Sequence, residues 1–221
     1  MRTMNPLTQL ETVTALGYAI SAHRLNNNLY VKPAGYRAGM IIDGVVVRPN
    51  RDIMQELVAD PLFVQDSSVI QLAREMREHF KGYFIELLSA DDDHSISKSI
   101  LELISQDTIS RNSTGLLCYL PKKFADDTMR NTLSERLSRL VSQHLGSMAK
   151  KIELTIEVID IKFYALYNSY MMTAISGDNI IVFHSKQKFQ GTNLKVSGRV
   201  KSHSKDKYGN LVTQINYVKQ V

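Results

Sequence analysis

The stretch IELTIEVIDIKF, residues 152–163, decides the fold of the second part of this 221-residue chain. Up to Val158 its apolar residues occupy every second position, which is the pattern of a strand with one buried face. From Ile159 onward the apolar residues occupy the other set of positions. One extra residue in a β-bulge produces such a shift, so the sequence predicts a bulged strand here.

Further short strands are expected after this one, because apolar runs alternate with turn signals. Gly177-Asp178-Asn179 is typical of a tight turn, and a loop centred on Lys207-Tyr208-Gly209-Asn210 separates the last two runs. The expected strands cover residues 180–183, 193–202 and 211–219. Several short strands with bulge and turn signals indicate a small antiparallel barrel or curled sheet of the OB-like type.

The first two thirds of the chain have helical spacing instead. Helices are expected from Asn5-Pro6 to Asn26, over 51–59, over 69–80 with a Ser67 or Ser68 cap, from Ser95 to Ile104, and from Asp126 or Asp127 to Leu145. Asp43-Gly44 predicts a hairpin turn, and the apolar run 115–120 predicts a short buried strand. The sequence therefore predicts an α+β protein, with a mostly helical domain at 1–146 and an OB-like β domain at 147–221.

Composition excludes several classes of protein. Hydrophobic residues make up 43% and charged residues 22% of the chain, ordinary values for a soluble globular protein. No apolar run approaches the roughly eighteen residues that a spanning helix needs, so we expect no membrane partner. The polar start Met1-Arg2-Thr3-Met4-Asn5-Pro6 is unlike an export signal, and the single Cys118 excludes an internal disulfide. These features predict a cytoplasmic protein, in the host cell cytoplasm if the chain is viral.

The net charge of +5 is unevenly distributed along the sequence. Residues 181–221 contain eight basic residues and one acidic residue, a net +7, so residues 1–180 carry −2. Clustered lysines and arginines gain free energy from counterion release when they meet phosphates, which favours a polyanion as partner. A solvated strand edge, where lysines prevent aggregation, explains the charge equally well. Charge by itself leaves both interpretations open.

The strand expected at 193–203 places several of these basic residues on one face. Its apolar residues alternate with basic ones, which places four groups on one face: Lys195, Arg199, Lys201 and His203. Alternate residues of a strand are about 6.6 Å apart, comparable with the phosphate spacing of an extended single strand. The predicted nucleic-acid-binding residues are these four together with Lys205, Lys207 and Tyr208. We expect Lys195, Arg199 and Lys201 to neutralise phosphates, Lys205 and Lys207 to act from the loop, and Tyr208 to stack on a base.

Three other aromatic residues near this strand have two interpretations. Phe183, Phe189 and Tyr217 can stack on bases, and the alternative for Phe183 and Tyr217 is that they belong to the core of the barrel. Phe183 lies inside an apolar strand, which favours the core. Tyr217 is expected on the same side of its strand as Ile215, opposite to Gln214.

The last quarter of the chain follows a recognisable order of motifs: an apolar strand, a glycine turn, a G-x-V-K-x-H-like strand, a glycine loop and a T-Q-L/I strand. These motifs are Ser169-Tyr170-Met171, Gly177-Asp178-Asn179-Ile180-Ile181-Val182-Phe183, Gly191-Thr192-Asn193-Leu194-Lys195-Val196-Ser197-Gly198-Arg199-Val200-Lys201-Ser202-His203, Tyr208-Gly209-Asn210, Thr213-Gln214-Ile215-Asn216 and Val218-Lys219. The segment resembles a module of bacteriophage nucleic-acid-processing proteins. The resemblance implies an OB-like barrel that binds single-stranded DNA in a viral protein of DNA replication or a related process. The tryptophan expected near Phe183 in that module is absent here.

No arrangement of residues in the sequence predicts catalysis. Asp91-Asp92-Asp93-His94 is the one acidic cluster, but contiguous carboxylates diverge and Ser95 caps a helix, so a solvated turn explains it. Cys118 lies in an apolar run and is expected to be a buried small hydrophobe. The six histidines lack metal-binding spacing, and no phosphate-binding or nucleophile motif occurs. We therefore expect no enzymatic activity, no cofactor and no metal.

Together these patterns predict a non-enzymatic accessory protein that binds single-stranded DNA or RNA in replication, recombination or transcription. Proteins of those processes are further expected partners, and the amphipathic helices at 69–80 and 129–145 offer surfaces for an oligomer. The alternative is a protein-interaction module, in which a phage structural or host-directed factor presents an edge strand or its basic tail to an acidic protein.

Overall fold

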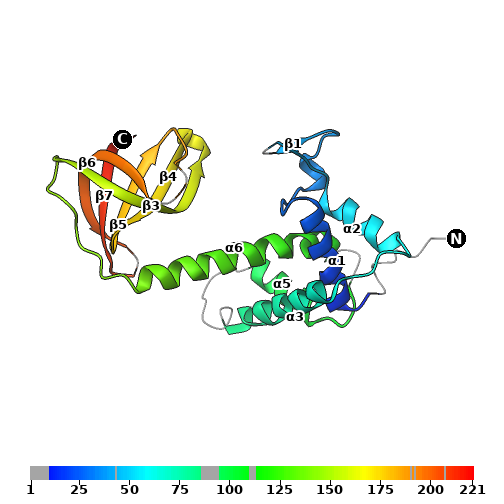
Figure 1. Cartoon of the computed structure of the whole chain (residues 1–221). Coiled ribbons are helices and arrows are strands. Elements are labelled where there is room, and N and C mark those ends of the chain that lie inside the picture. The colour runs from blue at the N-terminus through cyan, green and yellow to red at the C-terminus, as the bar shows by residue number, and fades with distance from the viewer. Residues whose placement is uncertain are drawn as a thin grey trace. The chain divides into compact units, whose positions relative to one another are not determined.

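The computed structural model describes residues 10–42, 44–85, 95–109, 113–189, 191, 193–206 and 208–221. In these ranges helices precede a closed five-stranded barrel, as Figure 1 shows. The predicted α+β fold, with a helical N-terminal region and a small C-terminal barrel, is therefore confirmed. The chain divides between residues 128 and 129 into two compact units. We call Met1–Thr128 the helical unit and Met129–Val221 the barrel unit. The sequence places the change of character later, after residue 146.

The helical unit is built around one apolar core. Its elements are α1 (Thr12–Leu25), the 3-10 turn η2 (Pro33–Gly35), the hairpin of β1 (Ile41–Ile42) and β2 (Val45–Val46), α2 (Asn50–Ala59), α3 (Ser67–Lys81), α5 (Ser95–Ser105) and the first part of α6 (Thr114–Ser138). Leu16, Met54, Phe80, Leu103 and Leu120 are fully buried in this core. The hairpin forms as predicted, although Asp43 in its turn lies outside the described residues. Asn5-Pro6 also lies outside them, but the helix predicted from there is wrong at its start, because Leu10 and Glu11 are not helical and α1 begins at Thr12.

α3 shows how the local sequence produces a helix in this unit. The side chain of Asp66 accepts a hydrogen bond from the backbone N–H of Ser68 at 2.6 Å, so the cap lies one residue before the expected serine. Its apolar face is buried, at Val69, Ala73, Met76 and Phe80. The predicted amphipathic helix at 69–80 is confirmed, and its apolar face is already covered by the core of its own unit.

The apolar run 115–120 is helical, so the predicted buried strand is wrong. It forms the start of α6, which continues through Pro121. A continuous apolar run does not distinguish a buried strand from a buried helix, because both place every side chain in the core. Proline removes one backbone hydrogen bond from the helix. Leu117, Leu120 and Pro121 are all buried, so packing into the core compensates for that loss.

α6 runs from Thr114 to Ser138, so the helix predicted from Asp126 or Asp127 to Leu145 is wrong at both ends, and the two aspartates lie inside α6 rather than capping it. The following residues 139–150, which we call the strap, carry no regular structure and bind the barrel through hydrogen bonds. The Ser142 hydroxyl donates to the backbone oxygen of Leu211, and the backbone N–H of Leu145 donates to Oγ1 of Thr213 at 2.8 Å. These long-range partners override the helical spacing of the segment.

The barrel unit contains five strands: β3 (Lys151–Tyr164), β4 (Ser169–Ser176), β5 (Asn179–Ser185), β6 (Leu194–Lys205) and β7 (Leu211–Gln220). Their order around the closed barrel is β3-β4-β5-β7-β6. All neighbours are antiparallel except β5 and β7, which run parallel, so the barrel is mixed rather than purely antiparallel. The pairing of β3 with β4 shifts between Val158 and Asp160, which confirms the predicted bulge.

The interior of the barrel is filled by apolar side chains. Ile156, Met172, Phe183, Val200 and Ile215 are fully buried there. Phe183 packs edge-on against Phe189, with ring centroids 5.7 Å apart, so its interpretation as a core residue is confirmed. Within the described residues, no helix combines the length and apolar character that crossing a membrane requires.

Candidate nucleic-acid interface

β6 presents a row of basic side chains on its outer face. Val196 and Val200 are buried in the barrel, whereas Lys195, Arg199 and Lys201 are exposed, as the alternation predicts. None of the ion pairs found in the described part of the chain involves these three residues. Their charges therefore remain available for an anionic ligand.

A concave groove lies beside this row and contains further basic groups. It is lined by Lys151, Ser197, Gly198, Arg199, Tyr217 and Lys219. These residues come from three neighbouring strands, because Arg199 on β6 lies opposite Lys151 of β3 and opposite Asn216 of β7. The groove thus joins three cationic side chains, of which Lys151 is paired with Glu153 at 3.1 Å, to one aromatic ring.

Tyr217 faces solvent because β7 bulges at this point. The register shifts between Ser197 and Arg199, and Tyr217 has the positive φ of 54° that such an extra residue adopts. Its side chain is 76% exposed, whereas Ile215, on the same side by strict alternation, is buried. The alternation rule therefore fails for Tyr217, and no signal in the sequence marks the bulge.

Tyr208 lies in a different groove from Arg199. It lines a depression together with the end of α6, at Leu133, Ser134 and Leu137, and its hydroxyl oxygen accepts a hydrogen bond from the hydroxyl of Ser134 at 2.6 Å. The carboxylate of Asp206 shapes the loop by accepting from the backbone N–H of Tyr208 at 2.8 Å. The structure thus separates the predicted stacking residue from the phosphate-neutralising residues.

The same depression shows that α6 shares the outer face of β4 and β5. Thr173 and Val182 are paired across these strands and line the depression with Leu133 and Leu137. The Arg136 guanidinium and the Glu157 carboxylate also form a two-pronged ion pair, one arm measuring 2.8 Å. OB-like barrels generally bind oligonucleotides with the second and third strands, which here are β4 and β5. In this chain that face is partly occupied by its own helix.

The remaining predicted residues lie toward the end of β6. His203 is half-buried and stacks face to face on His144 of the strap, with centroids 4.3 Å apart and planes 5° from parallel. It therefore holds the strap to the barrel rather than joining the row of exposed cations. Lys205 is exposed at the last position of β6, and Lys207 lies outside the described residues.

A cluster of titratable side chains in the helical unit joins α3 to α6. Asp127 is bound by Lys123, Tyr83 and His79, the last at 3.3 Å between Nε2 and Oδ2. Burial raises the pKa of Asp127, but the three hydrogen bonds outweigh it, so the net shift is downward. The polar groups of this cluster satisfy one another, which identifies a structural tie between the helices.

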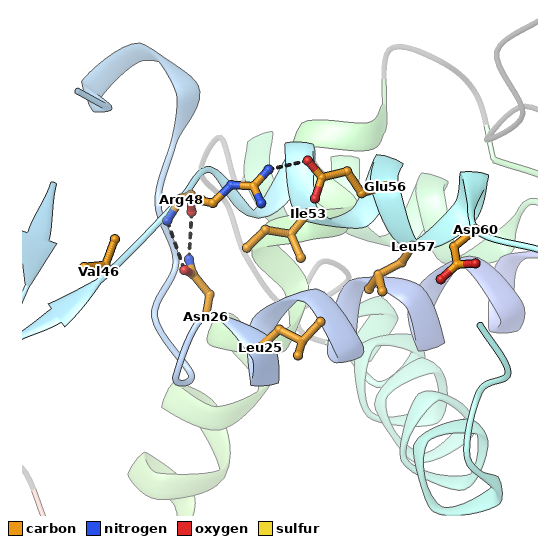
Figure 2. A pocket seen from close by; sticks show the side chains of 8 residues that line it. All are labelled: Leu25, Asn26, Val46, Arg48, Ile53, Glu56, Leu57 and Asp60. Atoms are coloured by element: carbon orange, nitrogen blue, oxygen red, sulfur yellow. Dashed lines mark hydrogen bonds and ion pairs between the residues drawn. The ribbon is translucent and has the colours of Figure 1, made fainter. Parts of the chain in front are cut away.

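Figure 2 shows a pocket in the helical unit, between α1, α2 and the chain after β2. Leu25, Ile53 and Leu57 form its apolar wall. Arg48 makes an ion pair with Glu56, and the hydrogen bond between them holds the pKa of the Glu56 carboxyl below its usual value. The guanidinium and the Glu56 carboxylate neutralise each other, and Asp60 leaves the lining of this pocket with a net negative charge.

The described residues contain no group of three or more histidine, cysteine, aspartate or glutamate side chains placed to bind a metal. Cys118 is buried beside Met54, and burial raises the pKa of its thiol to about 12, which keeps it protonated. The acidic cluster Asp91-Asp92-Asp93-His94 lies outside the described residues.

No family model, no curated protein and no solved structure matches this chain.

Proposed function

We propose that the chain is a non-enzymatic accessory protein whose barrel unit binds single-stranded DNA or RNA. The observation that carries this proposal is the row of Lys195, Arg199 and Lys201, exposed and free of ion pairs in the described part of the chain. The groove at Tyr217 adds Lys151 and Lys219 beside it. Phosphates bind such cations, and an aromatic ring beside them offers a base a surface for stacking. Roles in replication, recombination or transcription, and the phage relationship, rest on the resemblance of the sequence.

The closed barrel argues against one form of the alternative function. β6 pairs with β3 on one side and with β7 on the other, so its backbone has no open edge for adding a partner strand. An acidic protein that binds the basic side chains is then the remaining rival.

Fluorescence anisotropy with a labelled oligothymidine, measured over a range of salt concentrations, tests the proposal. We expect the affinity to fall steeply with salt, because each phosphate neutralised on a single strand adds about 0.7 to the logarithmic slope. Replacing Lys195, Arg199 and Lys201 together by glutamine removes up to three such contacts. The slope should therefore become shallower by about 2, with little dependence on base sequence.

The matched control is the triple variant Lys32→Gln, Arg37→Gln and Lys98→Gln, which removes the same charge from exposed positions of the helical unit. It should leave the slope unchanged. Equal losses in the two triple variants, or no salt-sensitive binding by the unmodified chain, would contradict the proposal. Capture of an acidic protein that survives nuclease treatment and high salt would favour the rival.

A further inference from the structure

We infer that the end of the barrel at the β3–β4 connection is a base-stacking site for single-stranded nucleic acid. The inference rests on the proposed function and adds the place where bases, rather than phosphates, are bound. We call this surface the aromatic end, and it consists of Phe163, Tyr164, Tyr167 and Tyr170.

The aromatic end exposes large rings, and Phe163, Tyr164 and Tyr170 among them each contact another ring. Phe163 is 53% exposed and Tyr167 is 71% exposed. Phe163 and Tyr170 lie opposite each other on β3 and β4, with ring centroids 5.0 Å apart. Tyr164 lies 6.3 Å from the ring of His184 on β5. Rings supported in this way lose little conformational freedom when a flat ligand stacks on them.

The surroundings of the aromatic end are positively charged. Residues 161–177 contain Lys162 and no acidic residue, and residues 179–205 contain six basic residues, among them Lys186 and Lys188, and again no acidic residue. The neighbouring Asp160 is within 3.3 Å of Lys162. Lys186 and Lys188 are exposed, and Lys188 lines the same groove as Phe163 and Tyr170. A ligand that combines negative charge with flat rings complements this surface.

Strand pairing connects the aromatic end to the groove at Tyr217. Met171 on β4 lies opposite His184 on β5. β5 and β7 run parallel, with Phe183 opposite Ile215, so the next residues along them, His184 and Asn216, are neighbours. Asn216 in turn lies opposite Arg199 on β6. A single strand can therefore pass from the rings to the cations without crossing the face that α6 occupies.

This path also favours nucleic acid over an anionic membrane. Aromatic and lysine side chains together also suit a lipid surface. The aromatic end and Arg199 belong to different strands around a closed barrel, however, so they face different directions. A flat bilayer contacts one part of such a curved surface, whereas a flexible strand follows it.

The inference is tested by fluorescence anisotropy, which compares the affinity of the full chain for the labelled oligothymidine with that of the double variant Tyr164→Ala and Tyr167→Ala. We expect affinity to fall about tenfold for each ring lost, with the salt slope unchanged, because stacking releases no counterions. An oligonucleotide of abasic residues should bind the unmodified chain and the double variant equally. The variant Tyr167→Phe should retain the affinity, because it keeps the ring.

Leu166→Ala is the matched control, since Leu166 is 85% exposed in the same connection but has no ring. It should bind like the unmodified chain. Unchanged affinity in the double variant overturns the inference while the proposed function stands. If the unmodified chain shows no salt-sensitive binding to oligothymidine at all, the proposed function itself fails. If the unmodified chain sediments with phosphatidylserine vesicles and the Leu166→Ala variant does not, the surface binds a membrane and the inference is overturned.

Discussion

The helical unit and the barrel unit use their charged side chains in opposite ways. Residues 1–128 contain 13 basic and 16 acidic residues, whereas residues 129–221 contain 14 basic and 6 acidic residues. In the helical unit the carboxylate of Asp127 is buried and binds a lysine, a tyrosine and a histidine of the same unit. In the barrel unit the cations of β6 are exposed and lack such partners in the described chain. The comparison indicates that buried charge ties the helices of the first unit together, whereas β6 of the second unit leaves its cations exposed and without ion pairs among the described residues.

The largest expected effect is on the helical unit, in the variant Asp127→Ala. Removing this carboxylate takes away the acceptor that Lys123, His79 and the hydroxyl of Tyr83 share, and breaking a buried ion pair costs about 3 kcal/mol or more. We expect the free energy of unfolding of the helical unit to fall by that amount. Urea denaturation followed by circular dichroism measures it, and hydrogen exchange resolved by peptide shows whether α3 and α6 open first.

Asp126→Ala is the control for this prediction. Asp126 is the adjacent residue and pairs with Lys122, but both side chains are more than 40% exposed, so the loss should stay below about 0.5 kcal/mol. Exchange in the barrel strands should be unchanged in both variants. Faster exchange in β5 of the Asp127→Ala variant would show that the contrast between the units is wrong.

A smaller effect is expected in the barrel unit for Gly198→Ala. An added Cβ would lie 3.2 Å from the backbone oxygen of Asn216 and 3.2 Å from Cδ1 of Ile215. The backbone oxygen cannot move without disturbing the bulge that exposes Tyr217, so the free energy of unfolding should fall by about 1–2 kcal/mol. Gly35→Ala, where a Cβ meets open space, is the control. Equal stability of both variants would mean that the bulge tolerates a side chain.

The sequence predicts the structure correctly where the spacing of apolar residues along one strand or helix determines it. The alternation at Lys195, Arg199 and Lys201 and the bulge after Val158 were both readable, because a half-buried strand repeats every two residues. α3 was readable for the same reason at a period of 3.6 residues. The exposure of the β6 cations can thus be predicted from the local sequence alone.

The sequence-based predictions failed where distant parts of the chain decide. The strap has helical spacing, but Leu211 and Thr213 of β7 bind its polar groups in an extended form. The second bulge, at Tyr217, depends on the register of β6 against β7. The aromatic residues of the aromatic end can be identified in the sequence, but their exposure depends on their position in the connection between β3 and β4.

The smallest expected effects concern pH, and they separate the two units again. Burial lowers the pKa of His23 in α1, the charge of Lys122 lowers it further, and Asp126 opposes this. The folded helical unit therefore takes up a proton on His23 only at a lower pH than the unfolded chain, which takes it up near pH 6.5. Stability is complete above that pH and falls as the pH decreases through it, by at most about 1.4 kcal/mol per pH unit.

In the barrel unit the corresponding group is Glu157. Its hydrogen bond to Arg136 holds the pKa of the carboxyl below 4.5, so its contribution is present above that pH and disappears as the pH falls below it. The two side chains are 46% and 35% exposed, so the loss should stay below about 1 kcal/mol. Hydrogen exchange measured between pH 7 and pH 4, corrected for the intrinsic rate, should show α1 weakening first and β3 later. His23→Gln should remove the first step alone, whereas simultaneous weakening of α1 and β3 near pH 6 would contradict the assignment of His23 to the helical unit's stability.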